Sequence, residues 1–103
     1  MVPDLALARE YKRRVVGAFD ARVARVALYG SRARGDARAD SDWDIAVFLV
    51  GDATADDFDR LADLGTDLLY ETGQYVQPMP IPARRLDEDS TLLRAIRADG
   101  ISL

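Results

Sequence analysis

The chain has 103 residues, a length that predicts one compact domain spanning residues 1–103, with any large substrate supplied by a partner. Fourteen basic residues against 18 acidic residues give a net charge of −4, so stable binding to nucleic acid is not expected. The absence of cysteine and histidine excludes disulfides, thiolate chemistry and imidazole bases, which leaves carboxylates, hydroxyls, arginines and backbone amides for any catalysis.

The beginning of the chain carries charged residues and lacks the basic-then-apolar order of a secretion signal. No apolar run approaches the roughly 20 residues that span a bilayer. These features predict a cytoplasmic protein that does not contact a membrane.

The spacing of apolar residues predicts the secondary structure of the first half of the chain. Apolar residues recur at intervals of three and four from Leu5 to Phe19, which predicts a helix. Residues 23–29 are short and rich in β-branched and aromatic side chains, which predicts a strand that ends at Gly30 and Ser31. Residues 31–41 are polar and predict a loop with one helical turn. The nearly continuous apolar run 44–50 predicts a central strand covered on both faces.

A second long helix is predicted from Thr54, which with Asp57 resembles a capping box, to the neighbourhood of Gly73. Its spacing predicts five inward-facing side chains: Phe58, Leu61, Leu64, Leu68 and Leu69.

Residues 75–81 look extended but contain prolines, and Pro82 follows, so they predict an edge strand. A last helix is predicted over residues 90–99. This order of elements predicts an α/β (α+β) fold in which helices pack on a small mixed β-sheet.

Chemistry-bearing residues concentrate in the window 30–44. Gly30 and Gly35 have the spacing of a phosphate-binding P-loop, but Asp36 and Ala37 follow where that loop needs Lys and Ser or Thr. Acids at positions 40, 42 and 44 match the start of a calcium-binding EF-hand loop, which here lacks its central glycine and its final glutamate. Both interpretations are therefore rejected.

What remains is Gly30 and Ser31 at the end of one strand and, ten residues later, Asp42 and Asp44 at the start of the next. Residues two apart on a strand face the same side about 6.5–7 Å apart, while Trp43 faces the other way and is predicted to pack in the core or, as the alternative, to line the nucleotide pocket. Two carboxylates at that separation repel by roughly 2.4 kcal/mol at an effective dielectric near 20. One or two Mg²⁺ ions would relieve this repulsion and support displacement at phosphorus, so both acids are predicted catalytic metal ligands.

The pattern Gly30-Ser31-x10-Asp42-x-Asp44 resembles the signature of the DNA polymerase β-like nucleotidyltransferases. The segments 33–35 (Ala-Arg-Gly) and 41–45 (Ser-Asp-Trp-Asp-Ile) are similar to the short stand-alone branch, called minimal or MNT-type. The resemblance implies the polymerase β-like fold, with Gly30 and Ser31 holding the triphosphate of ATP and both aspartates holding magnesium. The loop arginines 32, 34 and 38 carry charge that can neutralise phosphate, and Arg32 is included among the predicted nucleotide-binding residues.

Stand-alone members of this family commonly act as antitoxins beside a HEPN ribonuclease toxin and transfer AMP from ATP to a tyrosine of that toxin. The resemblance therefore implies Mg²⁺-dependent AMPylation of a HEPN toxin partner. The family often places a third carboxylate on the strand after the second long helix, whereas residues 74–79 contain no acid and Gln77 offers only a neutral oxygen. This departure leaves an alternative, a non-catalytic nucleotide-binding antitoxin or interaction module that neutralises its partner by direct binding.

Overall fold

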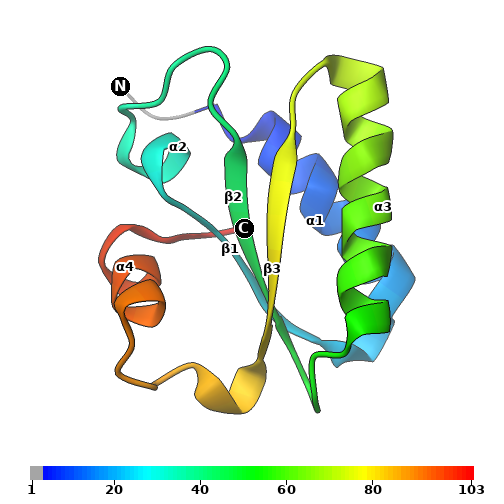
Figure 1. The fold of residues 1–103 in the computed structure, drawn as a ribbon, viewed down its shortest axis with the longest axis vertical. Helices are drawn as coiled ribbons and strands as arrows, with labels where there is room; N and C mark the ends of the chain where they lie inside the picture. The colour runs from blue at the N-terminus through cyan, green and yellow to red at the C-terminus, as the bar shows by residue number, and fades with distance from the viewer. Residues whose placement is uncertain (1–3) are drawn as a thin grey trace.

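The computed structural model describes residues 4–103 as four helices and a four-stranded sheet (Figure 1). Short 3₁₀ turns follow α1 (Asp20–Arg22) and β3 (Ala83–Arg85). The elements in chain order are α1 (Ala6–Phe19), β1 (Val23–Tyr29), α2 (Ser31–Arg34), β2 (Trp43–Leu49), α3 (Ala55–Thr72), β3 (Val76–Pro82), α4 (Thr91–Asp99) and β4 (Ile101–Ser102). Every predicted helix and strand is present within two residues of its expected ends, and β4 is an additional strand that was not predicted.

The strand order in the sheet is β3-β2-β1-β4. Strand β1 runs antiparallel to β2 and β4, whereas β2 and β3 are parallel, which confirms the predicted mixed sheet. Strand β2 lies in the interior, and all of its residues except Asp44 are buried. The apolar run therefore does form a central strand covered on both faces.

Helices cover both faces of this sheet (Figure 1). One core lies between the sheet and helices α1 and α3, and it contains Tyr11, Leu61, Trp43 and Ile45. A second, smaller core lies between the sheet and α4 and contains Phe48. Because side chains alternate along a strand, residues 43, 45 and 47 of β2 face the first core and residues 44, 46 and 48 face the α4 side. This alternation decides on which face Asp44 lies.

Helix α3 begins with the predicted capping box. The Thr54 hydroxyl accepts a hydrogen bond from the Asp57 N–H at 3.1 Å, and the Asp57 carboxylate accepts one from the Thr54 N–H at 3.0 Å. Arg22 also pairs with this buried carboxylate at 2.8 Å, and that bond is the main reason why the pKa of Asp57 lies well below its ordinary value. Thus α3 is tied to the start of β1.

The prediction that Phe58 and Leu69 point inward is wrong. Their exposed fractions are 42% and 38%, whereas Leu61 and Leu68 are buried as predicted. At 100° per residue, both exposed side chains lie beside the buried stripe and not within it.

Strand β3 is the edge strand that its prolines predicted, and it pairs only with β2. Alternate residues of a strand direct their N–H groups to the same side, so Gln77, Met79 and Ile81 can donate toward β2. The prolines at 78, 80 and 82 remove donors from the open edge, which limits pairing with another strand. In residues 4–103, no helix is both long enough and apolar enough to cross a membrane.

Candidate functional site

The corner between β1 and α2 is formed by Gly30, whose φ of 73° and ψ of −156° belong to a region that essentially only glycine adopts. A Cβ atom at this position would lie 2.5 Å from Oδ2 of Asp44, a distance that real Cβ atoms do not show. A larger residue would therefore strain the backbone and would also displace the tip of the Asp44 side chain. The structure brings Gly30 and Asp44 into direct contact, with Ser31 next in the chain as the first residue of α2.

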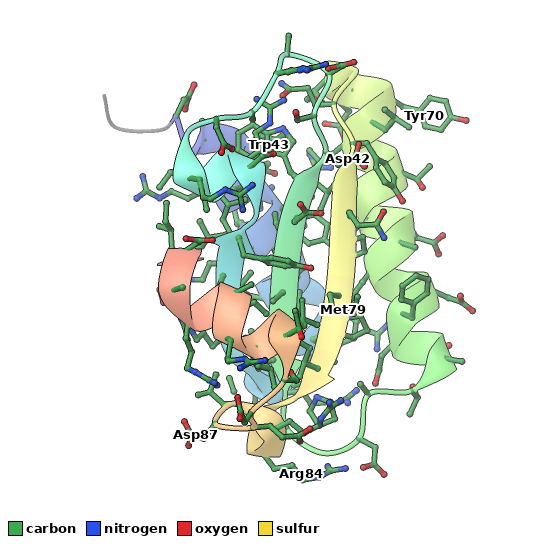
Figure 2. The ribbon with its side chains drawn as sticks, turned by 60° about the vertical axis from the view of Figure 1, so that its left-hand side comes forward. Asp42, Trp43, Tyr70, Met79, Arg84 and Asp87 are labelled. Carbon is green, nitrogen blue, oxygen red and sulfur yellow. The ribbon has the colours of Figure 1, made fainter. Side chains whose placement is uncertain are left out.

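The two predicted acids lie together at the beginning of β2. Asp42 is exposed and immediately precedes the strand, and Asp44 is partly buried on the α4 side (Figure 2 labels Asp42). Partial burial and, after it, the charge of Asp42 raise the pKa of Asp44, while the charge of Arg34 opposes the rise. Within residues 4–103 neither carboxylate takes part in an ion pair. Their negative charge is therefore available to a cation from outside the chain.

Trp43, between the two acids, faces the opposite side and is buried, as predicted. Its indole N–H donates a hydrogen bond to the Gln74 side chain at 2.9 Å. The guanidinium of Arg32 lies 4.5 Å from the centre of the indole ring and donates hydrogen bonds to the backbone carbonyls of Ala39 and Ser41. These contacts fix the start of β2 and the loop that precedes it.

The two arginines of α2 point in different directions and have different partners. Arg32 points toward Trp43, so its predicted phosphate contact would require the guanidinium to leave this position. Arg34 is the arginine whose charge acts on Asp44, and it is held by Asp36 at 3.2 Å and Asp99 at 3.6 Å. Residues two apart on a helix diverge by about 200°, which explains the difference. The sequence marked all three loop arginines as candidate phosphate ligands but held no signal to rank Arg34 first.

A row of three side chains crosses the sheet at Asp44. Its partner on β1 is Tyr29, and its partner on β3 is Gln77. Gln77 thus occupies the place next to Asp44 on the strand where a third carboxylate was sought. Glu71, the acid nearest to β3 in sequence, lies on α3 and pairs with Arg14 at 2.7 Å. Tyr29 was predicted only as a strand residue, and its register with Asp44 could not be read from spacing.

The donor set at this corner consists of oxygens: the carboxylates of Asp42 and Asp44, the hydroxyl of Ser31 and the amide oxygen of Gln77. Hard cations such as Mg²⁺ and Mn²⁺ prefer oxygen ligands, and Mg²⁺ commonly uses one or two carboxylates together with water and substrate phosphates. No group of three or more acidic, histidine or cysteine side chains in residues 4–103 could hold a metal. The two carboxylates alone could hold a magnesium ion only if water or a substrate supplied its remaining ligands.

A cavity of about 880 Å³ lies on the side of the sheet covered by α1 and α3, and the predicted nucleotide-binding residue Arg32 belongs to its lining. Leu7, Trp43, Leu68 and Gln74 belong to its lining, whereas neither Asp42 nor Asp44 does. The candidate acids therefore do not line this cavity.

Comparisons with known proteins agree with the motif. The family model described as "Polymerase beta, Nucleotidyltransferase" matches residues 17–103. A Methanocaldococcus jannaschii protein assigned as a protein adenylyltransferase is 38% identical over 65 residues. The matched segment covers 63% of this chain and 60% of that relative, which is less than two thirds of the relative's length.

Two solved structures share the fold. A chain of a toxin–antitoxin complex solved with AMP-PNP matches with a TM-score of 0.64 at 20% identity, covering 90% of this chain and 69% of the other. The structure of tri-AMPylated Shewanella oneidensis HEPN toxin in complex with MNT antitoxin matches with a TM-score of 0.52 at 16% identity, covering 91% and 69% of the two chains. At these identities the likeness shows a common fold.

Proposed function

The chain belongs to the polymerase β nucleotidyltransferase family, and from this premise we propose that it is a Mg²⁺-dependent protein adenylyltransferase. The donor would be ATP and the acceptor a tyrosine hydroxyl of a HEPN-type toxin, so that the chain acts as the antitoxin. The observation that carries the proposal is the contact between Asp44 and Gly30, because the carboxylate that would hold the metal lies beside the glycine that would hold phosphate.

In this proposal Gly30 and Ser31 bind the triphosphate, and Asp42 and Asp44 hold the metal. The metal ion, when bound, neutralises charge on the phosphates and on the leaving group. The acceptor oxygen forms a bond to the α-phosphorus while the bond from that phosphorus to the oxygen bridging the β-phosphate breaks. Pyrophosphate leaves with the electron pair, and the hydroxyl proton passes to solvent because Gln77 provides no base.

Two of the similar proteins support the acceptor class. The M. jannaschii relative is assigned as an enzyme that adenylylates proteins, and the S. oneidensis complex contains a HEPN toxin that carries AMP. The exposed position of Asp42 is compatible with a folded protein as the acceptor. The tyrosine itself is an inference from the family resemblance.

The direct test is incubation of the chain with ATP, Mg²⁺ and a HEPN-type toxin, followed by mass spectrometry of the toxin. We expect the toxin to gain AMP with the wild-type chain and not with Asp42→Asn or Asp44→Asn. Asp40→Asn is the matched control, since Asp40 is an exposed acid of the same loop. Equal modification by wild type and by both site variants would refute the assignment of these acids, and no modification by wild type would refute the transfer.

The neutral Gln77 favours a second candidate, a nucleotide-binding antitoxin without transferase activity. This candidate predicts that wild type and Asp42→Asn neutralise the toxin's ribonuclease activity equally and that no AMP is added. The same incubation therefore separates the two functions when toxin activity is measured alongside its mass.

A further inference from the structure

The solvent-facing side of α3 carries a row of exposed acids. Their spacing of three or four residues places them on one side of the helix: Asp56, Asp59, Asp63 and Asp67. Among the described residues 4–103, none of these four carboxylates takes part in an ion pair. Arg60, the only basic residue in α3, instead donates a hydrogen bond to the Ala18 carbonyl of α1 at 2.6 Å. The row is therefore a strip of uncompensated negative charge.

An apolar strip runs beside the acids, on the flank of α3 that borders β3. Its members Phe58 and Leu69 are 42% and 38% exposed. At 100° per residue, their side chains lie within about 20° of each other around the helix, whereas Arg60, which reaches α1, lies about 200° from Phe58. Gly65 lies about 20° from Phe58, and a Cβ on it would lie 3.2 Å from the Val76 carbonyl oxygen of β3. The strip thus faces away from α1 and overlooks the open edge of the sheet.

That edge of β3 offers hydrogen-bond acceptors without donors. The Tyr75 carbonyl accepts a hydrogen bond from the Trp43 N–H at 2.9 Å, so the odd-numbered residues of β3 direct their backbone groups toward β2. Residues 78, 80 and 82 direct theirs to the open side, and all three are prolines. An added strand would need donors from this edge and find none. Arginine and lysine side chains, which only donate, match it.

The acids, the apolar strip and the edge together favour one kind of occupant. A second copy of this chain does not fit, because a symmetric contact would bring the two rows of acids against each other. A protein surface with arginine and lysine between apolar side chains fits all three features. Its cations neutralise the acids, its donors meet the proline carbonyls, and its apolar groups cover Phe58. Tyr70, which is 87% exposed and projects from α3, adds a ring on which a guanidinium can stack (Figure 2).

Taking the partner from the proposed function, we propose that α3 and the open edge of β3 form the docking surface for the protein acceptor. The acceptor binds this surface through a region of its own that is rich in arginine and lysine. Strand β3 pairs directly with β2, so an acceptor held at this edge lies one strand, about 4.8 Å, from the strand that carries Asp44. Docking there brings the acceptor close to the proposed transfer site without occupying it.

Calorimetry of the full chain with the HEPN-type toxin tests this surface. Asp59→Lys/Asp63→Lys is expected to bind the toxin at least about tenfold more weakly than wild type, because like charges then oppose each other. The KM for the toxin should rise, whereas ATP affinity and the rate at saturating toxin should not change. Asp87→Lys/Asp89→Lys is the matched control, since it changes the net charge equally between β3 and α4 (Figure 2 labels Asp87) and should bind the toxin like wild type.

A second variant tests the apolar strip without changing the charge. Phe58→Gln should weaken toxin binding at least about fivefold, whereas Val16→Gln, at a similarly exposed position of α1, should not. Circular dichroism verifies that each variant is folded. Toxin binding by the α3 variants as tight as that of wild type, or equal weakening by the charge control, overturns the docking surface and leaves AMP transfer intact. Weakened binding by the α3 variants alone, without AMP transfer by wild type, supports the surface and refutes the transferase. Failure of wild type to bind the toxin refutes both.

Discussion

Replacement of Gly30 by alanine probes the contact on which the candidate site depends. The φ of 73° and ψ of −156° cost a non-glycine residue about 1–3 kcal/mol of stability. The added methyl group would in addition meet Oδ2 of Asp44 at 2.5 Å, so the carboxylate must move. We therefore expect Gly30→Ala to lose stability and also to lose binding of the metal–nucleotide complex.

Gly35→Ala is the matched control for this variant. Gly35 has a φ of 85° in the left-handed region, where alanine costs about 1–2 kcal/mol, but a Cβ there would meet no atom within 4 Å. Gly35→Ala should therefore be destabilised and still bind the nucleotide. In an Asp44→Ala background the contact at Gly30 is absent, so Gly30→Ala should there cost only its backbone strain.

Urea unfolding of wild type, Gly30→Ala, Asp44→Ala and the double variant gives the coupling free energy between positions 30 and 44. Calorimetry gives the nucleotide affinity of each protein. We expect a coupling of at least about 0.5 kcal/mol, as is usual for residues in contact. Additive unfolding free energies, or a Gly30→Ala variant that binds the metal–nucleotide complex as tightly as Gly35→Ala, would refute this account of the corner.

Three further predictions concern the scaffold and the acids. The lowered pKa of Asp57 means that its ion pair with Arg22 stabilises the fold above about pH 4, the unfolded value, and that this contribution is lost as pH falls toward the folded value. In urea unfolding between pH 7 and pH 2, Asp57→Asn should thus show a flatter pH dependence than wild type, and parallel curves would contradict this origin of acid sensitivity. Tyr11→Phe removes a buried hydrogen bond of 2.8 Å to the Leu61 carbonyl and should cost about 1 kcal/mol in chemical denaturation, whereas an unchanged midpoint would show that the bond contributes nothing. Asp44→Asn removes a partly buried carboxylate that Asp42 repels, so scanning fluorimetry in metal-free buffer should show a raised Tm; a lowered Tm would mean that the charge is compensated in the folded protein.

Local sequence signals predicted most of this fold. The apolar run of β2 and the Thr54–Asp57 capping box each carry their own physical cause within a few residues, and both appear as expected. Strand β4 has only two residues, too few to show any periodicity, and it is defined by the pairing of Ile101 and Ser102 with β1. Such pairing depends on tertiary packing, which spacing does not reveal.

Some features of the candidate site could likewise be predicted from the local sequence, whereas others depend on tertiary packing. The burial of Trp43 and the position of Asp44 on the opposite face of β2 followed from strand alternation, whereas Asp42 lies just before the strand. The partnership of Asp44 with Gln77 did not follow from it, because an 18-residue helix separates the strands and the packing of α3 sets their register. The preference for Arg34 over Arg32 near Asp44 likewise depends on where the four-residue α2 points.

Trp43 connects the stability of the core to the geometry of the acids. The strand that buries this indole against the α1–α3 core also directs its neighbour Asp44 to the opposite face, and Asp42 lies exposed just before the strand. Nothing in residues 4–103 pairs with those carboxylates, so their positions depend on the strand and not on ion pairs of their own. The buried side of β2 therefore positions the charged side, and the folded core offsets the cost of the repulsion between the two acids.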